Sequence, residues 1–159
     1  MAGKKKVRWK PGDLFGVALP DAQYCLGQAL GIMGEFTNVV NCAFFDLRFR
    51  AVDAAPSSDM DKLIAVVSTT RDLLDRGRWP VVGHTPVLIR KNDWPNERFA
   101  KKGYVGAETH GSGIVVHFLS AYYGLFPWDG YQDPEYFDKL LVSPAKKPSA
   151  SALKFKESK

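Results

Sequence analysis

Apolar residues in the first third of the chain fall into long runs that short polar turns separate. Residues 14–19 and 24–33 form the first two runs, and only residues 20–23 interrupt them, which predicts a β-hairpin. Ala22 stands where glycine would relieve a positive φ, so we expect a four-residue loop in place of a two-residue one. Residues 10–13, Lys-Pro-Gly-Asp, are a second turn signal that leads directly into the first strand.

The third apolar run, residues 39–49, predicts a long strand. In its second half Phe45, Leu47 and Phe49 alternate with charged residues, which is the period of a half-buried strand. Residues 62–69 are rich in β-branched side chains; they also fit one helical face, but we favour a strand. Together these segments predict an antiparallel meander.

Glycine and proline interrupt the middle of the chain. A short helix is expected around residues 73–74, and Gly77 would end it. Two prolines favour an edge strand or a loop for residues 79–86. Further strands are expected at residues 87–90 and 103–107, the second of them weakened by glycine.

The last third of the chain changes to a helical period. Residues 114–123 place four apolar side chains on one stripe, and Gly124 follows as a C-cap. Asp133 followed by Pro134 is a specific helix-start pattern, which predicts a second helix that ends near Leu141. The predicted fold class is therefore α+β, a strongly bent antiparallel sheet or small barrel covered by two or three short helices.

The positive charge of the chain is concentrated at its two ends. The 159 residues carry a net charge of +5, of which residues 4–6 contribute +3 and residues 145–159 contribute +4, leaving −2 for residues 7–144. We predict a basic tail at residues 1–8, one domain at residues 9–144 and a basic, disordered tail at residues 145–159. Solvated tails are the preferred interpretation, and a tail that binds phosphates is the alternative.

Neither a membrane segment nor a secretion signal is visible in the sequence. No run of 18 apolar residues occurs, and the lysines at residues 4–6 are not followed by an apolar stretch. The two cysteines, Cys25 and Cys42, are expected to be free thiols, although a bridge between them stays open. We therefore expect a cytoplasmic protein with no membrane partner.

The histidines and serines offer little catalytic chemistry. His84, His110 and His117 lack the spacing of zinc ligands, so neither a metal nor a cofactor is expected. His110 with Ser112 could form a hydrolase pair, but no Gly-x-Ser-x-Gly elbow surrounds the serine. Residues 111–113 could also hold an anion on free N–H groups at a helix start, although a flexible helix entry explains them more simply.

Four segments resemble one family of bacterial proteins. They are Lys-Pro-Gly-Asp-Leu-Phe at residues 10–15, Tyr-Cys-Leu-Gly-Gln at 24–28, Tyr-Tyr-Gly-Leu-Phe-Pro-Trp-Asp at 122–129 and Asp-Pro-Glu-Tyr-Phe-Asp-Lys-Leu-Leu at 133–141. Over about residues 8–143 the chain looks like the immunity protein 26 family of polymorphic-toxin and contact-dependent growth inhibition systems. The turn at Asp21-Ala22 departs from the glycine-containing turn expected there.

The resemblance implies a small α+β protein that protects its own cell. Such a protein binds the C-terminal domain of a cognate toxin, and the resemblance implies neither catalytic residues nor a cofactor. We expect this toxin to be a nuclease, so that contact with nucleic acid is only indirect, through the toxin. Immunity families differ widely in the toxin they neutralise.

The segment after residue 124 supplies the candidate toxin-binding surface. A nuclease has a basic active-site face, and acidic groups on an inhibitor would speed association with it by steering. Aromatic rings next to those acids have the composition of an interface hot spot. The expected toxin-binding residues are Trp128, Asp129, Tyr131, Asp133, Glu135 and Asp138. A simpler alternative places Trp128 in the core and leaves the acids to solvate a helix, and exposure of the ring separates the two.

A different class of function is a small β-barrel RNA-binding protein. Trp9, Tyr24 and Phe45 would then stack on bases while the lysine-rich tails bind phosphates. RNA affinity that depends on salt and disappears when both tails are deleted would support this alternative.

Overall fold

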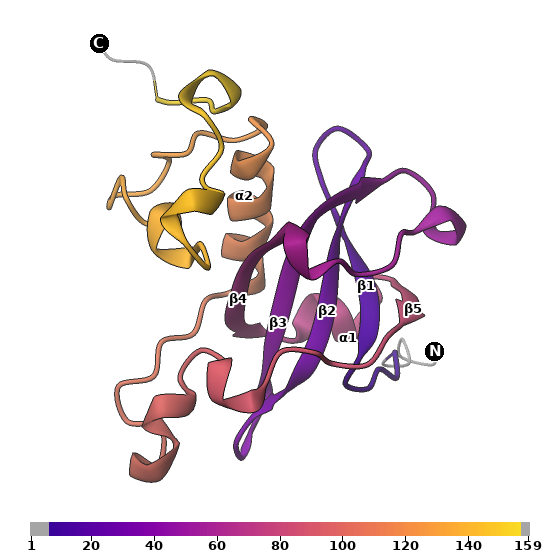
Figure 1. Cartoon of the computed structure of the whole chain (residues 1–159), viewed down its shortest axis with the longest axis vertical. Helices are drawn as coiled ribbons and strands as arrows, with labels where there is room; N and C mark the ends of the chain where they lie inside the picture. The colour runs from indigo at the N-terminus through magenta and orange to yellow at the C-terminus, as the bar shows by residue number, and fades with distance from the viewer. Residues whose placement is uncertain (1–6, 157–159) are drawn as a thin grey trace, which may run out of the picture.

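A single five-stranded antiparallel sheet organises the chain, of which the computed structural model describes residues 7–156 (Figure 1). The strand order is β4-β3-β2-β1-β5, so neighbours in sequence are neighbours in the sheet except for β5, which returns to pair with β1. The strands are β1 (Asp13–Ala18), β2 (Tyr24–Met33), β3 (Phe36–Phe49), β4 (Leu63–Thr70) and β5 (Val81–His84). The α+β class and the meander are confirmed. The sheet is open, with β4 and β5 at its edges, so the prediction that allowed a barrel is wrong in that respect.

The helices are short. Two are α-helices, α1 (Asp72–Asp75) and α2 (Ser112–Tyr122). The others described are 3₁₀ turns: η1 (Val52–Ala54), η2 (Met60–Lys62), η3 (Lys91–Asp93), η4 (Glu97–Lys102), η5 (Phe137–Leu140), η6 (Pro144–Lys146) and η7 (Ala150–Ala152). Within residues 7–156, no helix has the length and apolar character that crossing a bilayer requires.

The predicted hairpin is formed by β1 and β2, in the register Leu14 to Gln28 and Ala18 to Tyr24. The backbone N–H of Leu19 donates to the oxygen of Gln23 at 2.8 Å, so the loop is one residue shorter than the predicted four. Ala22 has a φ of 66°, the left-handed conformation expected at this position of a three-residue loop, and holds it without a glycine.

Two predicted strands and one predicted α-helix do not form. Residues 87–90 are irregular, and the side chain of Leu88 is 67% exposed, so this apolar run is not a buried strand. Residues 103–107 form turns, because Gly103, Tyr104 and Gly106 all have positive φ and therefore cannot continue an extended chain. The segment after Asp133 reaches only one 3₁₀ turn, η5, where a helix to Leu141 was predicted.

Both faces of the sheet are buried. On one face Phe15, Phe44 and Trp79 pack with the apolar stripe of α2 and with the residues that follow it. On the other face a smaller cluster that includes Phe45 and Ile89 is covered by irregular chain. Burial on both faces explains why β1 and β2 read as almost continuous apolar runs.

Helix α2 ends as the sequence predicted, with Gly124 closing its last turn. Gly124 has a φ of 75°, and the N–H of Leu125 donates to the oxygen of Ser120 at 2.8 Å, which completes the turn that closes the helix. The chain then reverses beside α2 in the closing segment, which we define as residues 125–141 (Figure 1). Cys25 and Cys42 are free, fully buried thiols, and burial raises the pKa of Cys25 to about 12.

Residues 145–156, for which the sequence predicts a disordered tail, lie against the closing segment. The N–H of Trp128 donates to the oxygen of Lys154 at 2.7 Å, and the N–H of Lys156 donates to Asp129 at 2.7 Å. The ammonium of Lys147 lies 2.8 Å from a carboxylate oxygen of Asp138. The lysine tail at residues 4–6 lies outside the described residues.

Candidate functional site

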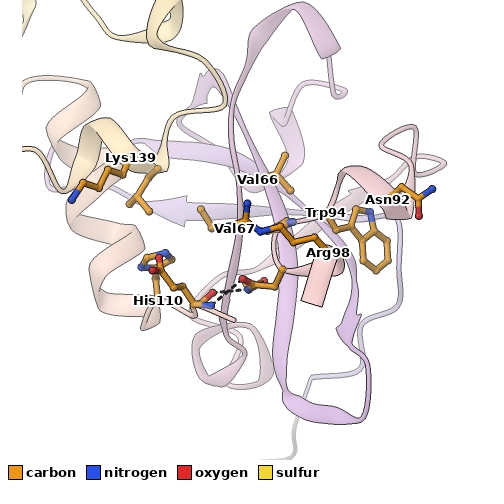
Figure 2. A pocket seen from close by; sticks show the side chains of 12 residues that line it. Val66, Val67, Asn92, Trp94, Arg98, His110 and Lys139 are labelled. Atoms are coloured by element: carbon orange, nitrogen blue, oxygen red, sulfur yellow. Dashed lines mark hydrogen bonds between the residues drawn. The ribbon is translucent and has the colours of Figure 1, made fainter. Parts of the chain in front are cut away.

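A polar groove of about 370 Å³ follows the outer edge of β4 (Figure 2). Residues 66–68 of β4 form its floor. One wall is formed by residues 92–98, and the opposite wall by residues 108–110 with Lys139 and Leu140. A second hollow of about 570 Å³ shares the latter wall and extends toward Asp133 and Tyr136. We call this continuous feature the β4 groove. Asp133, one of the predicted toxin-binding acids, lies in the second hollow. The wall of residues 92–98 contains none of the predicted site residues.

Within residues 7–156, the edge of β4 accepts two backbone hydrogen bonds from outside the sheet. The N–H of Val142 donates to the oxygen of Ile64 at 2.9 Å, and the N–H of His110 donates to the oxygen of Ser68 at 2.9 Å. His110 also forms an isolated parallel bridge with Thr69. The edge is thus closed at each end of the groove and open between the two closures.

A chain of side-chain hydrogen bonds fastens the wall of residues 92–98 to the sheet. The amide of Asn41 donates to the oxygen of Gly31 at 3.3 Å and its oxygen accepts from the Ser68 hydroxyl at 2.6 Å. That hydroxyl in turn accepts from the amide of Asn96 at 3.1 Å. Asn96 also makes two bonds with the backbone of Glu108, at 2.6 and 2.9 Å. One asparagine therefore joins both walls and the floor of the groove.

The sequence carries one signal for this role of Asn96, which was not among the predicted site residues. Asn96 has a φ of 71°, and asparagine after Trp94-Pro95 is one of the few residues other than glycine that adopts this conformation readily. What the sequence could not show is that a long polar excursion returns to the edge of β4.

The segments to which the two walls of the β4 groove belong differ in charge. Residues 90–102 contain five basic and two acidic side chains, whereas residues 129–139 contain four acidic side chains and one lysine. Lys139 is paired with Asp133 at 2.7 Å, which lowers the pKa of that carboxylate. Within residues 7–156, Arg98 has no carboxylate at ion-pair distance, and its guanidinium lies 4.7 Å from the ring centre of Phe99. The charged side chains that line the groove itself are Arg98 on one wall and Glu108, Lys139 and Asp133 on the other, so both signs are present.

His110 is part of the wall of residues 108–110, and its pKa is lowered. Its Nδ1 meets the hydroxyl of Tyr136 at 2.5 Å, and burial lowers the pKa of His110 below its ordinary value of 6.5 against the opposing effect of Glu108. The unfolded chain therefore binds this proton more readily than the folded protein does.

The free energy of unfolding should consequently decrease as the pH falls below about 6.5, because protonation then favours the unfolded chain. Urea unfolding at pH 7.5, 6.5 and 5.5 would measure this decrease. In His110→Gln the decrease between pH 6.5 and 5.5 should be smaller than in the wild type. Equal decreases in both proteins would show that His110 is not the group responsible.

Trp128 is a core residue and not an exposed anchor. Its side chain is 2% exposed and packs against Phe118 and Phe137, with ring centres 6.0 and 5.6 Å apart. By the exposure criterion set out from the sequence, its ring offers no surface to a partner. Tyr131 is half-buried, and its hydroxyl lies 2.6 Å from Nδ1 of His117.

The four predicted carboxylates have different surroundings. Asp129 and Asp138 are held by Lys156 and Lys147, as described above, and Asp133 by Lys139. Glu135 is exposed, and no basic group of residues 7–156 lies within ion-pair distance of it. Its N–H donates to Asp133 at 2.9 Å, which makes Asp133 a turn-stabilising residue as well as an acid.

Neither the hydrolase pair of His110 and Ser112 nor the anion site at residues 111–113 is formed in the structure. The hydroxyl of Ser112 donates to Asp72 at 2.8 Å and not to His110, so no serine–histidine pair forms. The N–H of Ser112 donates to the hydroxyl of Thr70 at 3.0 Å, so this N–H group at the start of the helix is not free to bind an anion. In the described part of the chain, no group of three potential metal ligands is found.

The three rings proposed for RNA stacking share no surface. Phe45 is 0% exposed, and Tyr24 is stacked on Phe49. Trp9 donates to Asp75 at 2.9 Å and is covered by the guanidinium of Arg71. Phe45 therefore cannot stack on a base, and the three rings do not form the proposed stacking surface.

The structure is a small α+β domain with a polar groove beside the open sheet edge at β4. The family model of Immunity protein 26 matches residues 10–124, and the chain belongs to this family. Membership implies that the protein binds and neutralises a cognate toxin. No curated protein and no solved structure matches the chain. The match covers the hairpin and most of the β4 groove, whereas the closing segment lies beyond it.

Proposed function

We propose that this protein neutralises the C-terminal toxin domain of its own polymorphic-toxin or contact-dependent inhibition locus by forming a complex that blocks the toxin's active site or substrate access. The observation that carries the proposal is the β4 groove in a member of the Immunity protein 26 family. The protein performs no chemistry of its own in this account. It acts in the cytoplasm, where the toxin would reach its target.

The toxin is proposed to be a nuclease because the closing segment presents acids. A nuclease needs a basic face to hold phosphates, and that face complements Asp133 and Glu135. Both acids lie on the rim of the second hollow or next to it, beside the half-buried rings of Tyr131 and Tyr136. Asp129 and Asp138 extend the acidic surface, and Trp128 supports it from beneath.

Survival of cells that express the toxin tests this function. The polypeptide encoded immediately upstream would be expressed alone and together with this protein, and both would be purified through a tag on one of them. We expect rescue of growth and recovery of a complex. Absence of both effects would contradict the proposed function.

Glu135→Lys should slow association with the toxin without changing the stability of the protein. Because Glu135 is exposed and unpaired among the described residues, reversing its charge removes only long-range attraction, which we expect to lower the association rate about threefold to tenfold at low salt. The difference should shrink at high salt. Surface plasmon resonance at two salt concentrations would measure both rates.

Asp53→Lys is the matched control. Asp53 is also exposed, and it lies in η1, in a part of the chain that does not line the groove. The account predicts that this variant changes the association rate by much less than Glu135→Lys. Equal effects of the two substitutions would place the interface elsewhere.

A further inference from the structure

We propose that the β4 groove takes an extended segment of the toxin, which adds to the edge of β4 at Val66 and places an acidic side chain against Arg98. This inference rests on the proposed function, because it names the part of the partner that the groove receives. It concerns the means of recognition, so it can fail while the proposed function stands.

The direction of the backbone at Val66 supports strand addition. The oxygens of Ile64 and Ser68 both accept hydrogen bonds from outside the sheet, so the even-numbered residues of β4 direct their N–H and C=O groups away from β3. Val66 lies between these two residues and shares their direction. Among the described residues, no backbone hydrogen bond from outside the sheet reaches Val66.

The groove at this point has room for a peptide. Its volume of about 370 Å³ lies directly over residues 66–68, and its other linings are mostly polar or charged. An unpaired N–H and C=O at a sheet edge are a ready template for another chain. The opposite edge strand β5 has only four residues and is flanked closely by Pro80 and Pro86, so it is a poorer template.

Arg98 identifies the chemistry of the incoming segment. Arg98 lines the groove together with Val66 and Val67, and Figure 2 shows its side chain extending from the wall of residues 92–98 toward Val67. No carboxylate of the described residues pairs with Arg98, and residues 90–102 around it carry an excess of positive charge. Glu108 on the opposite wall disfavours a second acid there. An aspartate or glutamate on the segment would therefore meet the guanidinium.

Amide hydrogen exchange at Val66 tests the addition of a strand. In the free protein this amide should exchange fast, and in the complex with the upstream-encoded toxin domain its exchange should slow by at least about 100-fold. The amide of Ser57, an exposed residue that lines neither hollow of the groove, serves as the control, and its exchange rate should not change. Strand addition would be overturned if the Val66 amide still exchanged fast in the complex, or if it already exchanged slowly in the free protein. Either result would leave the proposed function intact.

Arg98→Glu tests the acidic side chain, with Lys101→Glu as the matched charge reversal in the same turn η4. We expect Arg98→Glu to weaken toxin binding by at least about tenfold and Lys101→Glu by less than about threefold. Similar effects of both variants would overturn the specific pairing with Arg98. Failure of the wild-type proteins to form any complex would overturn this inference and the proposed function together.

Discussion

Trp128→Ala should lower the free energy of unfolding by about 3–5 kcal/mol, because removal of a buried indole leaves a large cavity. Trp128 packs between Phe118 of α2 and Phe137 of η5, so its loss separates the closing segment from the helix. Urea unfolding followed by circular dichroism would measure the change. This effect distinguishes a supporting core residue from the interface anchor that the sequence alone allowed.

Trp128→Phe separates packing from the indole N–H. The Nε1 of Trp128 is buried and has no hydrogen-bond partner in the described part of the protein, so phenylalanine removes an unsatisfied donor and keeps most of the ring. We expect Trp128→Phe to lower the free energy of unfolding by less than about 1.5 kcal/mol. A stable Trp128→Ala variant that had nevertheless lost toxin binding would contradict the core assignment and restore the anchor.

Asn96→Ala should lower the free energy of unfolding by about 2.5–5.5 kcal/mol. The substitution removes three side-chain hydrogen bonds, to Ser68 and Glu108, each contributing about 0.5–1.5 kcal/mol, and a weaker one to the sulfur of Met33. It also forces alanine into a left-handed conformation that costs about 1 kcal/mol. The amide of Glu108, which donates to Asn96 in the wild type, should exchange at least about tenfold faster. Urea unfolding and hydrogen exchange would measure the two effects.

Two further variants make this result specific. Asn96→Gly keeps the backbone conformation and removes only the side-chain hydrogen bonds. Its free energy of unfolding should therefore lie between those of the wild type and Asn96→Ala. Asn92→Ala, at an exposed position on the same wall, should change stability by less than about 0.5 kcal/mol. An Asn96→Ala variant as stable as Asn92→Ala would mean that the wall does not depend on this asparagine.

The elements that could be predicted from the sequence are those that form through contacts between residues close together in the chain. The β1–β2 hairpin, the strand at residues 62–69 and the helix ending at Gly124 all follow from patterns within about a dozen residues. Predictions failed where the chain packs by side-chain contacts that are distant in sequence. Residues 103–107 read as a strand, but positive φ at Tyr104 and two glycines turns the chain so that Tyr104 packs against Phe36.

The candidate site was only partly predictable for the same reason. The acids and rings of the closing segment stood out in the sequence, but their burial and ion pairs did not, and Trp128 is inside the core. The opposite wall was missed, because Asn96 and Arg98 become meaningful only once residues 92–98 return to the edge of β4. A groove between segments about forty residues apart has no signature in a single sequence.

Titration of toxin activity with the purified protein tests the central claim most directly. Nuclease activity of the upstream-encoded toxin domain would be measured with increasing amounts of this protein, at concentrations well above the dissociation constant. We predict a linear loss of activity that ends at a fixed stoichiometric ratio and is regained when the complex is dissociated. Inactivation of many toxin molecules by one molecule of this protein, or full activity in its excess, would contradict neutralisation by binding.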